Sequence, residues 1–196
     1  QQVTRLMTFP FIQNMLLTYE HDGRKKQFYE PRGYYVDSTF FELFTYDFIY
    51  GKLSSALDRP NSIVISDNIY NKFFTKAQDP VGKPIVISTP FGPATYTIKG
   101  VFSTAKYRSH IPANYLLSMT NGDMWNWVQQ QTNWTNNNVF YTYIKLRPSA
   151  DTKTFEKKLN PFLMQHAGDE MKAAGFLRTL FLQPVADIYL HSSVSG

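Results

Sequence analysis

The stretch "NSIVISDNIYNKFFTKAQDPVGKPIVI", residues 61–87, most constrains the fold, because four segments follow one another in it with almost no linker. Residues 62–66 form a short apolar run rich in β-branched side chains, which predicts a buried strand. Ser66 or Asp67 can cap the short amphipathic helix that follows. A Pro/Gly turn then leads into a second β-prone run at 83–88. The stretch therefore predicts a compact α+β piece.

Short β-prone runs recur along the chain, separated by turn residues. The run at 25–36 is interrupted near Pro31-Arg32-Gly33. The Phe and Tyr content is high, with 16 Phe and 13 Tyr, as is common in β-rich domains. The runs that predict further strands lie at 2–9, 25–36, 94–102, 114–119 and 139–147.

Two amphipathic segments predict further helices. The first is short and begins after Asp37 or Ser38, either of which can accept hydrogen bonds from free amides. The second spans 149–168, with Thr152 as its expected cap and Pro161 as a point that kinks or divides it. A final strand is expected from Phe176 onward, so the terminal third predicts a βαβ or split βαβ unit.

Charge and composition exclude several classes of protein. The net charge of +5 is spread along the 196 residues, and the densest basic cluster, Arg24-Lys25-Lys26, adjoins Glu20 and Asp22 in a turn. Nucleic-acid binding, which needs a clustered basic stripe, is therefore not expected. The chain has no cysteine, which excludes thiolate catalysis and disulfides. No apolar run approaches the roughly 18 residues of a membrane span.

The two ends of the sequence begin and stop abruptly, on "QQVTRLMTF" and "HSSVSG". We expect this of a soluble fragment excised from between membrane spans. A trimmed cytosolic chain would show the same ends, so both interpretations stay open.

No arrangement of residues predicts catalysis, a cofactor or a metal site. The four histidines, His21, His110, His166 and His191, show no metal-ligand spacing. The acidic residues offer no pair that would flank a glycosidic bond, and the phosphate-binding and nucleophile motifs are absent from the sequence. The chain is therefore expected not to be an enzyme.

A tryptophan cluster is the one candidate contact surface. Trp125, Trp127 and Trp134 lie among Asn, Gln and Thr residues, as in loops that hold a sugar or a peptide. The alternative is that the three rings fold back and cover a hydrophobic edge of the sheet. The triplet Asn133-Trp134-Thr135 also matches a glycosylation sequon, a match that often arises by chance.

Several motifs follow one another in a distinctive order between about residues 35 and 192. They are "VDSTFFELF", "GKLSSALDRPNSIVIS", the "FF…DPVGK" turn, "YTIKGVF", "YIKLRPSAD…FEKKL" and "VADIYLHS". Their order and spacing resemble the MacB-like periplasmic core domain of FtsX-like ABC transporter permeases, in the aromatic-rich form of Bacteroidetes-type bacteria.

The resemblance implies a fold and a location. It implies an α+β, two-lobed extracytoplasmic domain on the periplasmic side of the inner membrane, within an integral membrane protein. A porter-like split βαβ lobe would comprise residues 1–33 and 139–196, and a small inserted α+β lobe would comprise 34–138. The family's usual first strand and helix look absent or shortened, so the first unit is expected to be truncated, and residues 105–138 match no family motif.

The resemblance also implies a function without catalysis. Such a domain transmits ATP-driven motion to an exported substrate or a periplasmic partner. The implied partners are a cytoplasmic ATPase, a second permease copy and a periplasmic adaptor, peptide or lipoprotein. Two alternatives stay open: a stand-alone extracellular module that binds glycan or peptide through Trp125, Trp127 and Trp134, and a hydrolase with an unrecognised pair of carboxylates.

Overall fold

The computed structural model describes residues 2–7, 14–105, 109–120, 122–135 and 138–188 of the chain. The chain divides into two compact units. The first comprises residues 1–130 with 139–145, and the second comprises residues 131–138 with 146–196. Each unit is described by itself below.

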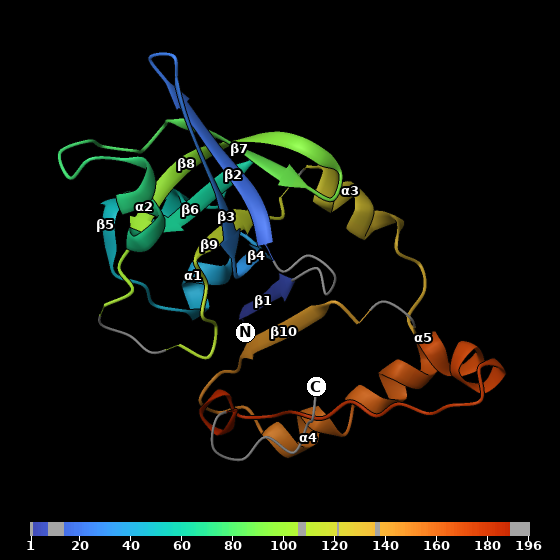
Figure 1. Ribbon diagram of the computed structural model, residues 1–196. Coiled ribbons are helices and arrows are strands. Elements are labelled where there is room, and N and C mark those ends of the chain that lie inside the picture. The colour runs from blue at the N-terminus through green and yellow to red at the C-terminus, as the bar shows by residue number, and fades with distance from the viewer. Residues whose placement is uncertain (1, 8–13, 106–108, 121, 136–137, 189–196) are drawn as a thin grey trace. The chain divides into compact units, whose positions relative to one another are not determined.

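The first unit is built on one mixed sheet, formed by ten strands of the described residues (Figure 1). The sheet runs in the order β10-β1-β4-β9-β6-β8-β7-β2-β3, and β5 pairs with β8 outside this path. The β4–β9 and β6–β8 pairs are parallel, whereas the other pairs are antiparallel. The strands are β1 (Gln2–Met7), β2 (Asn14–His21), β3 (Arg24–Pro31), β4 (Gly33–Val36), β5 (Phe48–Gly51), β6 (Ser62–Ser66), β7 (Pro84–Thr89), β8 (Gly92–Phe102), β9 (Tyr115–Ser118) and β10 (Phe140–Lys145).

Strand β6 lies near the middle of the sheet and is buried along its whole length. Successive side chains of a strand point to opposite faces. Ile63 and Ile65 accordingly belong to one hydrophobic cluster, and Val64 belongs to the other. The short β-branched run therefore packs on both faces, as the sequence predicts.

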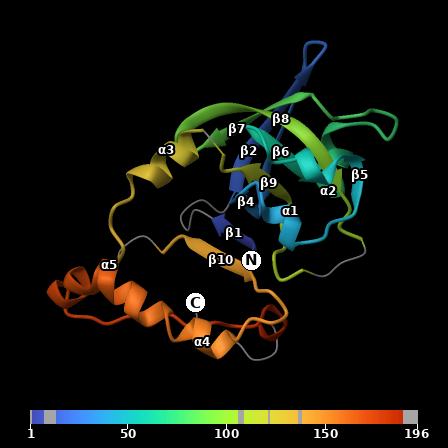
Figure 2. The same cartoon turned by 180° about the vertical axis from the view of Figure 1, so that it is seen from behind.

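Three short helices belong to this unit: α1 (Phe40–Leu43), α2 (Asp67–Phe73) and α3 (Asp123–Gln130). Helix α2 begins where predicted, because the Ser66 hydroxyl accepts a hydrogen bond from the Ile69 amide at 3.4 Å. Its inward stripe of Ile69, Tyr70 and Phe73 is buried. Helix α3 lies beside the end of the β7–β8 hairpin in both views (Figures 1 and 2).

The predicted interruption between β3 and β4 is confirmed. Arg32 takes a positive φ of 59° between the two strands. Gly33 follows, and a Cβ atom there would lie 2.1 Å from the ring of Tyr115, its partner in the β4–β9 register. Only a glycine at position 33 leaves room for that ring, so the residue that follows the break also allows Tyr115 to pack there.

The described residues of the second unit form α4 (Thr152–Glu156), α5 (Leu159–Ala173) and a 3-10 turn, η2 (Val185–Asp187). The two helices are divided just before Pro161, as predicted. The prediction of Thr152 as the cap is wrong: Asp151, one residue earlier, accepts from the amides of Lys153 and Thr154. Asp151 Oδ1 accepts from both amides, and Oδ2 accepts from the Thr154 hydroxyl, so the carboxylate satisfies three donors of the first turn.

The predicted final strand is also wrong for the described part of 176–188, which contains no strand. Two backbone amides that a neighbouring strand would otherwise satisfy bond to side chains instead. Leu180 donates to Asn160 Oδ1 and Leu182 donates to Glu156 Oε1, both at 2.7 Å. The α+β class is confirmed, whereas the division into two lobes at residues 33 and 139 stays a prediction.

Candidate functional site

The three tryptophans of the predicted contact surface do not share one unit. Trp125 and Trp127 lie on α3 in the first unit. Trp134 belongs to the second unit, where its ring stacks on His166 with 4.7 Å between the ring centres. A common surface formed by all three rings stays a prediction.

Trp125 and Trp127 differ in their surroundings although they are two residues apart. Trp127 packs against the larger hydrophobic cluster of the sheet, next to the buried Met124. Trp125 is half-buried and lines a cavity of about 440 Å³. The interpretation that the rings cover the core therefore fits Trp127, whereas Trp125 borders the cavity.

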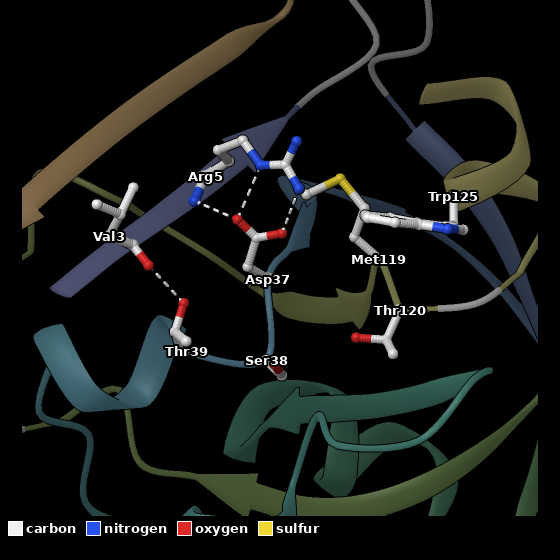
Figure 3. A pocket seen from close by; sticks show the side chains of 8 residues that line it. All are labelled: Val3, Arg5, Asp37, Ser38, Thr39, Met119, Thr120 and Trp125. Atoms are coloured by element: carbon white, nitrogen blue, oxygen red, sulfur yellow. Dashed lines mark hydrogen bonds and ion pairs between the residues drawn. The ribbon is translucent and has the colours of Figure 1, made fainter. Parts of the chain in front are cut away.

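The cavity is walled by residues from four separate parts of the first unit (Figure 3). Strand β1 contributes two side chains, the β4–α1 connection three, the segment after β9 two and α3 one. Figure 3 shows Trp125 on one side and the β4–α1 residues on the other. The lining residues are Val3, Arg5, Asp37, Ser38, Thr39, Met119, Thr120 and Trp125.

An ion pair between Arg5 and Asp37 forms the polar wall of this cavity. The carboxylate accepts from Arg5 Nε at 3.0 Å, from Arg5 Nη2 at 2.8 Å and from the Arg5 backbone amide at 2.7 Å. The prediction that Asp37 or Ser38 caps α1 is wrong, because the residue at the cap position is Thr39 and no side chain caps the helix. A guanidinium that donates two charged hydrogen bonds is a stronger partner for the Asp37 carboxylate than the amides at a helix end.

The pair leaves the cavity close to electrically neutral. The hydrogen bond to Asp37 raises the pKa of the Arg5 guanidinium above its ordinary value, although burial opposes this shift. Both side chains are partly exposed, at 32% for Arg5 and 21% for Asp37. The guanidinium also lies 6.0 Å from the Trp125 ring centre and 5.6 Å from that of Phe140, within the reach of cation–π attraction.

Sequence reasoning missed this ion pair. Arg5 and Asp37 are 32 positions apart, and β1 pairs with β4 only at Leu6–Val36 and Met7–Tyr35. That short register is what places Arg5 beside Asp37. No local spacing signals such a pair, so only the pairing of the strands could have revealed it.

Each of the three described histidines has different neighbours. His21 pairs with Asp22 at 3.3 Å, His110 contacts the Tyr143 hydroxyl at 3.1 Å, and His166 stacks on Trp134. His191 lies outside the described residues. Across the described ranges, no group of three or more His, Cys, Asp or Glu side chains could hold a metal ion.

Burial shifts the pKa of several side chains outside the cavity. It lowers the pKa of His110 and raises the pKa of Tyr46 and of Tyr143 to about 12. Tyr46 and Tyr143 pack against the hydrophobic cluster that contains Val64, and His110 contacts the Tyr143 hydroxyl, so these shifts follow from packing. None of them lines the cavity beside Trp125.

Comparison with known families decides the identity of the fold. The family model of the MacB-like periplasmic core domain matches residues 4–162. The chain belongs to this family. It is thus a periplasmic domain of an ABC transporter permease. No helix in the described part of this core domain is long and apolar enough to cross a membrane.

Two solved structures resemble the core domain in fold. One is a domain assigned to a permease protein of Porphyromonas gingivalis, with 21% identity and a TM-score of 0.61 over 98% of this chain and 83% of that chain. The other is the extracellular domain of the noncanonic ABC-type transporter YknZ from Gram-positive bacteria, with 16% identity and a TM-score of 0.52 over 86% and 76% of the two chains. No curated protein matches the chain.

Proposed function

We propose that this domain transmits ATP-driven motion from the membrane part of a permease to an exported substrate or a periplasmic partner, without catalysis of its own. The proposal rests on family membership and on one structural observation, the pairing of β1 with β10. The two strands pair over six residues, from Gln2–Lys145 to Met7–Phe140.

The β1–β10 pair joins the first described strand of the chain to the last. In a domain held between two membrane helices, the connection from the first helix enters the sheet at β1, and the connection from the second helix reaches β10 through residues 146–196 of the second unit. A relative movement of the helices would therefore reach the sheet through β1 and β10. The hydrogen-bonded ladder would carry it onward to β4 and β9.

The far end of the same sheet provides a surface on which such motion could act. The β2–β3 hairpin projects from the body of the first unit (Figure 1). Its turn carries Asp22 and Gly23 with positive φ values of 50° and 69°, and most of β3 is exposed. We infer that a periplasmic adaptor, peptide or lipoprotein binds at this end of the sheet.

The division into a porter-like lobe (1–33 and 139–196) and an inserted lobe (34–138) is part of the proposal.

The proposed partners on the membrane side are a cytoplasmic ATPase and a second permease copy. In a dimer, the motion would change the distance between the two periplasmic domains. The 196 residues contain no cysteine, so in a permease whose remaining cysteines are replaced by serine a Lys25→Cys variant places one spin label in each copy, near the tip of the hairpin.

Pulsed electron paramagnetic resonance on the complete permease with its ATPase tests the proposal. We expect the Lys25–Lys25 distance distribution to differ between the nucleotide-free and the vanadate-trapped states. The matched control is an ATPase variant that binds ATP without hydrolysing it or closing. An identical distribution in all states would overturn the proposal.

A further inference from the structure

The cavity beside Trp125 has the chemistry of a ligand site. We propose that it binds a neutral saccharide, with one sugar ring stacked on Trp125 and its hydroxyls held by Arg5 and Asp37. This inference does not depend on the transmission of motion. It concerns what the domain recognises outside the membrane, and the two proposals can fail separately.

The first argument is the indole of Trp125. It is half-buried, and it makes no hydrogen bond to any residue that the structure describes. The face of an aromatic ring carries partial negative charge and attracts the polarised C–H groups of a sugar ring. Trp127, by contrast, is occupied by the core, so α3 directs one of its two tryptophans inward and the other toward the cavity.

The second argument is the geometry of the ion pair. Asp37 Oδ1 accepts a single hydrogen bond, from Arg5 Nη2, and a carboxylate oxygen can accept more than one. Arg5 Nη1 donates to no described residue, so a free donor and a free acceptor lie on adjacent groups. Two neighbouring sugar hydroxyls, one accepting and one donating, match this pair.

The third argument is charge and size. The ion pair is internally compensated, so the cavity offers no surplus charge to a phosphate or a carboxylate ligand. The hydroxyls of Ser38 and Thr120 add polar groups that make no hydrogen bond with other described side chains. The volume of about 440 Å³ falls within the roughly 300–1,000 Å³ typical of small-ligand sites.

An extended peptide is the competing ligand, and the cavity suits it less well. Peptides are commonly bound by adding a strand to an exposed sheet edge. Here β1 pairs with β10 along one side. On its other side, beside the cavity, the Arg5 amide donates to Asp37 Oδ2, the Arg5 carbonyl accepts from the Asp37 amide and the Val3 carbonyl accepts from the Thr39 hydroxyl, so these backbone groups are already bonded. A compact ligand that stacks on one ring and bonds to one ion pair fits the observed walls better.

Saturation-transfer difference NMR on the 196-residue chain tests the proposal, with maltotriose, triacetylchitotriose and trialanine as probes. We expect transfer to the ring C–H protons of at least one trisaccharide. The transfer should fall at least tenfold in Trp125→Ala and return in part in Trp125→Phe. Thr120→Val should weaken binding without removing the aromatic ring.

Trp134→Ala is the matched control, because Trp134 is exposed and belongs to the second unit. This variant should bind like the original chain, and circular dichroism should show that every variant is folded. The proposal is overturned if neither trisaccharide binds at 10 mM (about the weakest affinity worth assigning), if binding survives Trp125→Ala, or if only trialanine binds.

Discussion

The two units of the molecule bury their apolar side chains to very different extents. The first has two large clusters on the faces of its sheet, with many side chains at or near zero exposure. The second has one small cluster of Leu163, Ala167 and Met171, with Phe176 packed against it. Burial of apolar surface is the main stabilising term in folding. The sheet unit should therefore be much the more stable of the two.

Exposed apolar side chains sharpen this contrast. The second unit leaves Phe162 at 48%, Phe181 at 53% and Leu177 at 78% exposure. In the first unit, many neighbouring strands of the sheet come from distant parts of the sequence. Residues close in sequence therefore cannot restore the hydrogen bonds of a strand pair once that pair is broken. We expect the first unit to respond to mutation as one cooperative body, and the second to open locally at low cost.

The largest effect should come from equivalent deletions in the two cores. Ile65 and Met171 are both fully buried. Ile65→Ala should lower the free energy of unfolding of the sheet unit by about 3 kcal/mol, because it leaves a cavity at the centre of the sheet. Met171→Ala should melt the second unit and leave the sheet transition in place.

Urea unfolding followed by tryptophan fluorescence measures this difference. Trp127 reports on the sheet unit, and Trp134 reports on the second unit once the other tryptophans are replaced by Phe. If the two units unfolded in one transition, and if its urea midpoint shifted equally in Ile65→Ala and Met171→Ala, the two units would not differ in stability as expected.

A smaller effect is expected from a buried ion pair in the sheet unit. The Glu30 side chain is only 2% exposed and accepts from Lys72 Nζ at 2.6 Å, which ties β3 to α2. Lys72→Met leaves this carboxylate unpaired and should cost about 2 kcal/mol, a value discounted because Lys72 is 44% exposed.

Chemical denaturation of Lys72→Met, with Lys25→Met on the exposed hairpin as the control, checks this prediction. The double variant Glu30→Gln/Lys72→Met should recover part of the loss, since no charge is then buried. An equal cost for both lysine variants would show that the pair does not anchor α2.

The cap of α2 should contribute less again. Ser66→Ala removes the acceptor for the Ile69 amide and should cost about 1 kcal/mol. The exposed Ser88 on β7 provides a matched control, and Ser88→Ala should change the urea midpoint little. No difference between the two variants would mean that packing alone holds α2.

The smallest effect should be a dependence on pH. Burial lowers the pKa of His110 in the folded chain, so the unfolded chain takes up the proton first as the pH falls. The associated stability is present above the ordinary pKa of about 6.5 and is lost as the pH falls through that value. Urea midpoints at pH 7.5 and 5.5 should differ more for the original chain than for His110→Gln. If the urea midpoint changed equally between the two pH values in both chains, His110 would not be the source of the pH dependence.

The parts of the fold that could be predicted are those set by local chemistry. The β6–α2–β7 stretch was predictable because Ser66, the apolar stripe of α2 and the Pro/Gly turn act within a few residues. The cap of α1 was mispredicted because Asp37 is taken by Arg5 from a distant strand. The final strand was mispredicted because side chains of α4 and α5 hold its amides.

The candidate site was only partly predictable for the same reason. Tryptophans among amide residues mark a surface, so Trp125 was found. The other walls come from β1, the β4–α1 connection and the end of β9, which the sheet brings together from far along the chain. Pairing of β1 with β4 cannot be deduced from one sequence without an alignment or a structure.

The proposed transmission of motion requires that the β1–β10 pair and the strands beside it stay hydrogen-bonded while the permease works. Hydrogen–deuterium exchange on the complete permease with its ATPase tests it directly. We predict that the amides of β1, β10, β6 and β9 stay protected during ATP turnover, and that those of α5 exchange faster in every state. Loss of protection along the β1–β10 pair during turnover would contradict the account.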